Sequence, residues 1–425
     1  MKKKLVTICL FFLTFYFYSN NFGLGLKNVN ENRINVPHRY FEFNTTVNTG
    51  ASNNYFAAED IFVEELIFDL KKIATELPSG GFSFNAFTDT KYGADLNLPN
   101  GMHFAFETGI DFYCKGIISK DLFEFLGYGN KLNETLTFDG KAIADLFFYT
   151  NVTGGFDFLG FHVEITPTLF APILHGESKD LYAKFENNSN GTTVATASAG
   201  STFYSSLNLK PFFDNNFDFS NFNALDAFSE MDNYYGFDLA LSLEHKIFDT
   251  LQGAAYTRIP IVPGKLVNST SLTTSIRYEV KSIFDMIMGS EDSATKTTEY
   301  SGITYNSSEY YLHRPFKMGA QAVWRPFGKW CTFNSLLGFA VRNPFSSDAE
   351  FFMEYDFGVN FTILHILGFD ISTSYENQIF MHTVGVILNF RLIEINASVV
   401  CQGGNFVQSF KGTGAGCVIA VKMGF

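Results

Sequence analysis

Apolar and polar residues alternate along much of the chain with the two-residue period of a β-strand. Within residues 102–114, Phe104 and Phe106 fall on one face of such a strand, and His103 and Glu107 fall on the other. The same alternation appears in three further segments, 270–281, 380–392 and 393–403. A soluble β-sandwich also alternates in this way. Here the apolar faces are rich in Phe and the polar faces in Gly, Ser, Thr and Asn, which favours a wall between lipid and a wet lumen.

These segments predict an all-β fold, a transmembrane antiparallel β-barrel with a few short helices. At roughly ten residues per strand plus loops, residues 26–425 would form a single barrel domain of about 14 strands, within a range of about 12–16. Counting back from the last strand, we expect short inner turns at 325–330 and near Leu392. Longer outer loops are expected at 285–313, 343–349 and 403–413.

The last twelve residues, GAGCVIAVKMGF, give the most specific pattern in the sequence. Counting back from Phe425, every second residue is apolar, including Met423, Val421 and Ile419. A closing strand that ends in an aromatic residue resembles the recognition signal of bacterial outer-membrane barrels. We therefore predict that this strand is the barrel-insertion signal and that it is a ligand of the outer-membrane assembly machinery.

Residues 1–25 are typical of a secretory signal peptide. Lys2–Lys4 form a positive segment, Leu5–Tyr18 form an apolar core, and Gly25 offers a small residue for cleavage. The alternative, an uncleaved membrane anchor, is disfavoured because the apolar run is shorter than the roughly 18 to 20 residues that span a bilayer. No long apolar run follows residue 25, so only a closed barrel could satisfy the backbone inside a membrane.

One long segment has the period of a helix. Residues 59–77 place Phe62, Leu66, Leu70 and Ile73 on one stripe, and Pro78 follows as a stop. Two interpretations remain open: a loop helix packed on the barrel rim, or a plug or gate inside the lumen. The four stripe residues are the candidate plug. A second short helix is expected at residues 120–127.

Composition narrows the function classes. Phe occurs 51 times, charged residues make up 17%, mean hydropathy is +0.04 and the net charge is −13. An acidic chain without a basic run is a poor candidate for nucleic-acid binding. The sequence contains no HExxH, GxSxG or P-loop motif, and its 8 His lack zinc-type spacing. We therefore expect no catalytic residue, no cofactor and no metal site, and the chain is interpreted as not an enzyme. Glu354 and Asp356 are expected to line the pore, balanced by residues such as Arg277 or Arg391.

Part of the chain resembles a known family. The segments Gly50–Phe56, Asp60–Leu77 and Leu122–Gly129, with the terminal Met423–Phe425, resemble a family of spirochaete outer-membrane barrels grouped with the long-chain fatty acid transporters (FadL-like). The resemblance covers about a quarter of the chain and implies a barrel of about 14 strands whose N-terminal plug admits hydrophobic molecules. The Asn-Pro-Ala signature expected early in that plug is absent.

Two functions follow as hypotheses. The first is an outer-membrane channel or transporter for small, hydrophobic nutrients such as long-chain fatty acids. The second is a surface-exposed structural or adhesin barrel that contacts host molecules through the loops at 285–313 and 403–413. Both place the chain in the cell outer membrane, in contact with lipid and without nucleic acid.

Overall fold

A computed structural model describes residues 39–57, 69–99, 101–129, 135–187, 193–207, 234–280, 294–346, 349–363, 366–376 and 378–425. The expected signal peptide, Phe62 and Leu66 lie outside these ranges. Within them, no helix is long and apolar enough to cross a membrane.

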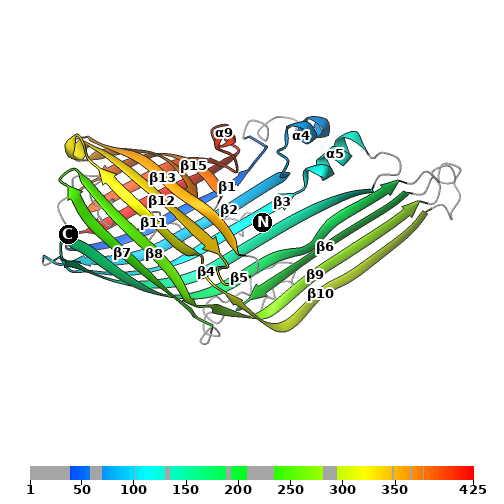
Figure 1. Cartoon of the computed structure of the whole chain (residues 1–425), viewed down its shortest axis with the longest axis horizontal. Helices are drawn as coiled ribbons and strands as arrows, with labels where there is room; N and C mark the ends of the chain where they lie inside the picture. Colours follow the sequence, from blue (N-terminus) through cyan, green and yellow to red (C-terminus); the bar gives the residue numbers. More distant parts are fainter. Residues whose placement is uncertain are drawn as a thin grey trace, which may run out of the picture.

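Antiparallel strands make up most of the described residues (Figure 1). In chain order they are β1 (Phe41–Asn53), β2 (Phe82–Asn97), β3 (His103–Ile118), β4 (Thr135–Phe158), β5 (Phe161–Asn187), β6 (Thr193–Ser205), β7 (Gly236–Phe248), β8 (Leu251–Val262), β9 (Gly264–Val280), β10 (Ala294–Leu312), β11 (Phe316–Trp324), β12 (Cys331–Arg342), β13 (Glu350–Ile363), β14 (Leu367–Glu376), β15 (Ile379–Asn389), β16 (Ile393–Gly403) and β17 (Gly414–Gly424). The helices are α4 (Leu70–Glu76), α5 (Lys120–Tyr128) and α9 (Phe406–Ser409), with a 3-10 turn, η2, at Gly328–Trp330.

The described strands close into a ring. Pairing runs β1 to β5, then β7, β8 and β11 to β17, and β17 returns to β1. Three of the 17 strands, β6, β9 and β10, lie outside this circuit, so the ring itself has 14. The predicted all-β fold, a closed antiparallel barrel, is confirmed. The 17 strand segments are one more than the predicted range of about 12–16. The excess arises from β6, β9 and β10, which lie beyond the ring.

These three strands form a sheet that extends past the ring. The first part of β5, Phe161–Phe170, pairs with β7, whereas its later part, Leu174–Asn187, pairs with β6. β8 runs into β9 across Pro263, and β10 runs into β11 across residues 313–315. Figure 1 shows β6, β9 and β10 reaching far beyond the closed part of the wall. The predicted outer loop at 285–313 is wrong in its described part, because Ala294–Leu312 pairs with β9 as a strand.

The two ends of the barrel differ. We call the end that holds Phe425 the inner end and the opposite end, where α4, α5 and α9 lie, the outer end. The turn at 325–330 joins β11 to β12 at the inner end, with Gly328 at φ 75°. A second tight turn leads through Leu392 into β16, so both predicted inner turns are confirmed. The segment 403–413 forms an outer connection, as predicted. It contains the short helix α9, which was not predicted.

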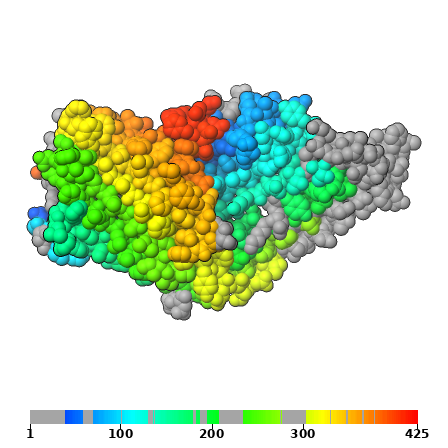
Figure 2. Space-filling view, in the orientation of Figure 1, coloured from blue at the N-terminus to red at the C-terminus, as the bar shows by residue number. Residues whose placement is uncertain are grey.

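The first and last strands form a seam. Residues from Glu42 to Ser52 pair in register with residues from Gly424 to Gly414. The Phe425 carbonyl oxygen also accepts hydrogen bonds from the backbone nitrogens of Tyr40 and Phe41, at 2.8 and 3.2 Å. Figure 2 shows the red C-terminal part of the chain lying against the blue N-terminal part.

The wall has an apolar outside and a mixed inside. On β3, Phe104 and Phe106 are 44% and 51% exposed on the outer surface, while His103 is buried inside, which confirms the predicted faces. Two apolar clusters lie within the ring or against its wall. One includes Phe87, Tyr113, Ile379, Met381, Val400 and Val418, and the other includes Phe147, Tyr149, Phe170, Leu266 and Leu312.

Candidate functional site

Charged and aromatic side chains meet in the lumen around a cavity of about 140 Å³. Most of these residues reach the cavity because alternate residues of a strand point to the same face, whereas Arg314 lies between β10 and β11. Five acidic and five basic side chains line it, so the site is nearly neutral in charge although the chain is acidic. The basic members are Lys91, Arg258, Arg314, Lys317 and Arg342. At this level the lumen is a constriction and not a wide aqueous pore.

Lys317 holds two carboxylates of the wall. Its Nζ lies 2.9 Å from Oε1 of Glu354 and 3.4 Å from Oε1 of Glu376. The Glu354 side chain is fully buried, which makes this the most desolvated of the described ion pairs with lysine. Glu354 therefore faces the lumen as predicted. Its partner differs from the expected one, because Arg391 lies in an inner turn with a φ of 75°.

Arg342 crosses the lumen. It stands at the end of β12, and its guanidinium carbon lies 4.1 Å from the centre of the Tyr113 ring on β3. Its Nε lies 3.8 Å from Oδ2 of Asp145 on β4, and its Nη1 lies 3.2 Å from Oε2 of Glu350. Lys115 on β3 reaches the same Glu350 carboxylate at 3.8 Å. Because β3 and β4 lie far around the ring from β12 and β13, these contacts brace opposite walls and narrow the passage.

Two further arginines border the cavity, and one of them stacks on an aromatic ring. Arg314 lies 3.3 Å from Oδ2 of Asp238, and its guanidinium stacks over the Tyr149 ring at 4.6 Å. Arg258 donates from Nε to the Pro315 carbonyl at 3.0 Å. Within the described part of the chain, no carboxylate lies at ion-pair distance from Arg258. Its terminal nitrogens are therefore available to an anionic ligand.

The aromatic side of the cavity is continuous with an apolar cluster. Phe147 and Tyr149 line the cavity and also pack with Phe170, Leu266 and Leu312. The cavity consequently places aromatic surface next to guanidinium groups, with five carboxylates in the same lining. Such an arrangement suits a small amphipathic molecule with an anionic head.

The candidate plug is described only in part. Leu70 and Ile73 lie on α4, which packs beside α5 at the outer end (Figure 1). The Asp69 carboxylate accepts hydrogen bonds from the backbone nitrogens of Lys71 and Lys72, so Asp69 is the N-cap and α4 begins at Leu70. A continuous helix over 59–77 is therefore wrong, because the backbone at Asp69 is extended. The plug role remains a prediction. The helix expected at 120–127 is confirmed by α5.

The predicted insertion signal lies on the seam strand. Ile419 and Val421 pair with Val47 and Thr45 of β1, and Met423 and Phe425 are exposed on the outer surface. The strand and its outward apolar face agree with the sequence pattern. Recognition by the assembly machinery remains a prediction.

Comparisons with known proteins assign this chain to no family. No family model and no curated relative matches this chain. Among solved structures, the toluene transporter TbuX of Ralstonia pickettii has a TM-score of 0.44 and 8% identity, covering 92% of this chain and 90% of its own. The toluene transporter TodX of P. putida has a TM-score of 0.44 and 8% identity, covering 96% and 95%. The translocator domain of NalP from Neisseria meningitidis has a TM-score of 0.33 and 6% identity, covering 94% and 93%. At these TM-scores and identities, the likeness does not indicate which molecules this chain transports, if it transports any.

Proposed function

We propose that the chain is an outer-membrane channel that passes small hydrophobic molecules with an anionic group, of which long-chain fatty acids are the type. The observation that carries this proposal is a single cavity bordered by the rings of Phe147 and Tyr149 and by the guanidinium of Arg258. Apolar surface is stabilised against aromatic rings by about 25 cal/mol per Å² removed from water. A carboxylate gains charge-assisted hydrogen bonds from a guanidinium. One ligand with both parts makes both kinds of contact.

An outer-membrane location is supported by the exterior of the ring. Phe351, Met353 and Val399 are between 62% and 66% exposed on strands long enough to cross a bilayer. Lipid would cover these side chains, whereas water would leave a large apolar surface unsatisfied. A ring without unpaired edges also satisfies its backbone in lipid.

Passage requires movement inside the lumen. The cavity is narrow, and the contacts of Arg342 join opposite walls of the ring. We infer that the described arrangement is an occluded state, which opens when these contacts break. The stripe of Phe62, Leu66, Leu70 and Ile73 is proposed as the gate. Its two described members, Leu70 and Ile73, lie on α4 at the outer end.

The proposal is tested by binding of laurate and of dodecanol to the detergent-purified protein. These ligands have the same apolar chain and differ in the anionic head. We expect tighter binding of laurate, and loss of that preference in Arg258→Gln. Arg325→Gln is the matched control, because Arg325 lies at an inner turn and donates to Gln252 at 2.7 Å. Equal affinity of the wild-type protein for both ligands, or no binding of either, would contradict the proposal.

A second function is favoured by a separate observation. β5 has 27 residues and β10 has 19, whereas about 9 to 11 residues cross a bilayer. The later part of β5, with β6, β9 and β10, extends past the ring. We infer that this sheet stands clear of the membrane and contacts host molecules. Binding of protein-bearing vesicles to immobilised matrix proteins, abolished by an antibody fragment against the β9–β10 hairpin, would favour this adhesive role. Absence of such binding would leave transport as the function.

A further inference from the structure

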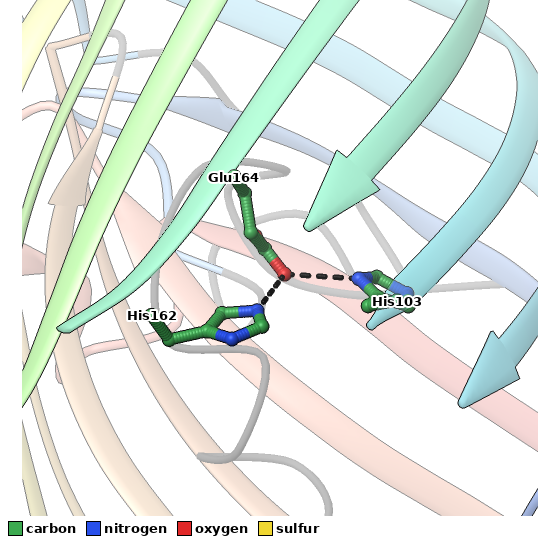
Figure 3. A group of neighbouring side chains, drawn as sticks. All are labelled: His103, His162 and Glu164. Atoms are coloured by element: carbon green, nitrogen blue, oxygen red, sulfur yellow. Dashed lines mark hydrogen bonds and ion pairs between the residues drawn. The ribbon is translucent and has the colours of Figure 1, made fainter. Parts of the chain in front are cut away.

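Two histidines and three carboxylates gather at the inner end of β2 to β5, apart from the cavity described above. His103 is the first residue of β3, and His162 and Glu164 are the second and fourth residues of β5. Figure 3 shows both imidazole rings turned toward the Glu164 carboxylate. The three ligand atoms lie within 4.8 Å of one another.

A glycine on the intervening strand makes this approach possible. His103 pairs with Gly155 of β4, and Gly155 in turn pairs with Glu164 of β5, so the three residues form one row across the wall. A Cβ at position 155 would lie 2.9 Å from Nε2 of His162, 3.1 Å from Cβ of His103 and 3.3 Å from Cγ of Glu164. A residue with a side chain would therefore fill the space between the three groups.

The distances fit ligands of one small cation. His103 Nδ1 lies 3.0 Å from Oε1 of Glu164, and His162 Nε2 lies 3.4 Å from the same oxygen. Zinc–nitrogen and zinc–oxygen bonds of about 2.0–2.2 Å place two ligands of a tetrahedral ion about 3.3 Å apart. The two nitrogen–oxygen distances already match this spacing.

The far side of each ring is held by a carboxylate. His103 Nε2 lies 3.1 Å from Oδ1 of Asp95, and His162 Nδ1 lies 2.7 Å from Oδ1 of Asp157. In metal sites this arrangement fixes the ring orientation and directs the lone pair of the other nitrogen at the ion. His162 Nε2 is buried and, among the described residues, makes no hydrogen bond. That nitrogen is positioned as a ligand would be.

We propose that His103, His162 and Glu164 bind one divalent transition-metal ion, with Zn²⁺ as the type, and that Asp95 and Asp157 orient the two imidazoles. Two imidazoles and one carboxylate suit zinc, copper or nickel, whereas Mg²⁺ and Ca²⁺ prefer oxygen ligands throughout. The fourth position is left for water. The ion would join β3 to β5 across β4 at the inner mouth of the barrel, and this proposal does not depend on the transport proposal.

Titration of Zn²⁺ into the tag-free, detergent-purified protein tests the site, with Mg²⁺ as the comparison ion. We expect one Zn²⁺ per chain and no saturable binding of Mg²⁺. Glu164→Gln and His103→Gln should each weaken Zn²⁺ binding by at least about tenfold, and Asp157→Asn by about tenfold. Co²⁺ should give the visible absorption of a four-coordinate nitrogen–oxygen site in the wild-type protein.

Two further variants sharpen the test. Gly155→Ala keeps every ligand but fills the space between them, so it should lose Zn²⁺ binding. His382→Gln is the control, because His382 lies at the outer end against Ser409, at 2.8 Å, and should bind as the wild type does. Folding of each variant is checked by circular dichroism and heat-modifiable gel mobility. If the wild type binds no stoichiometric Zn²⁺, or if the folded double variant His103→Gln/His162→Gln binds it unchanged, the cluster is an ion-pair network only and the proposal fails.

Discussion

Replacing Arg342 should open the lumen. The Arg342→Gln variant loses the contact with Asp145 on the opposite wall, the ion pair with Glu350 and the stacking over Tyr113. The remaining side chain is shorter and uncharged, so it cannot reach across to β3 and β4. We therefore expect the occluded arrangement to lose much of its advantage over an open one.

The size of the effect follows from burial and distance. The Arg342 and Asp145 side chains are only 6% and 7% exposed, which places the pair among the buried ones, whose disruption costs about 3–5 kcal/mol. The separation of 3.8 Å is long and Glu350 is 42% exposed, so a value of about 2–3 kcal/mol is reasonable. Since 1.4 kcal/mol corresponds to about a tenfold change in an equilibrium, the ratio of open to closed protein should rise by about 30- to 140-fold.

Planar-bilayer recordings measure this change. We expect rare openings of the wild-type protein and frequent or sustained openings of Arg342→Gln, with Arg325→Gln behaving as the wild type. Heat-modifiable mobility should show that all three proteins are folded barrels. If folded Arg342→Gln conducts no more often than the wild type, the cross-lumen contacts do not keep the passage closed, and the reasoning is refuted.

Three further predictions concern the wall. Lys317→Met leaves the fully buried Glu354 without its 2.9 Å partner and should lower the free energy of unfolding by about 3–5 kcal/mol in urea titrations. Adding Glu354→Gln to the same chain should recover part of this loss. If the losses of the two single variants simply add in the double variant, the pairing is contradicted. Val384→Arg puts a charge on the outer face, where the side chain is 61% exposed, and should lower the free energy of unfolding by about 2–4 kcal/mol, whereas Thr383→Arg on the lumen face should lower it less; equal losses would contradict the assigned faces. Deleting Phe425 removes the carbonyl that accepts from the first strand and should reduce the assembled fraction in membranes, measured by heat-modifiable mobility; unchanged assembly would exclude a role for that residue.

The faces of the strands could be predicted from sequence because their period is fixed by backbone geometry. His103 is buried and Phe104 exposed, as alternation requires, and the same holds for Val384 against its neighbours. The inner turn at 325–330 was predictable because Pro326 and Gly328 mark it. These features depend on residues that are adjacent in the chain.

Features that depend on the ring as a whole were not predictable. A strand beyond the closed ring needs no apolar face, so Ala294–Leu312, rich in Ser, Thr and Tyr, has the composition of a loop although it forms β10. Nothing in the local sequence places Arg342 opposite Asp145, because the distance around the ring depends on which strands pair. The His-x-Glu spacing of His162 and Glu164 was a local signal, but its third member comes from β3.

The β1–β17 seam has a consequence for how the chain acquires its fold. Most strands that are neighbours in the ring are consecutive in sequence, and the pairs β5–β7 and β8–β11 flank the inserted strands β6, β9 and β10. At the seam, by contrast, the paired residues Thr45 and Val421 are far apart in the chain. Bringing such distant residues together carries the largest loop-closure entropy and is slow. A chain with every hairpin formed would still expose the unpaired backbone edges of β1 and β17 to other unfolded chains. The interval before β1 and β17 pair is therefore the one in which the chain is most prone to aggregation and most dependent on a chaperone.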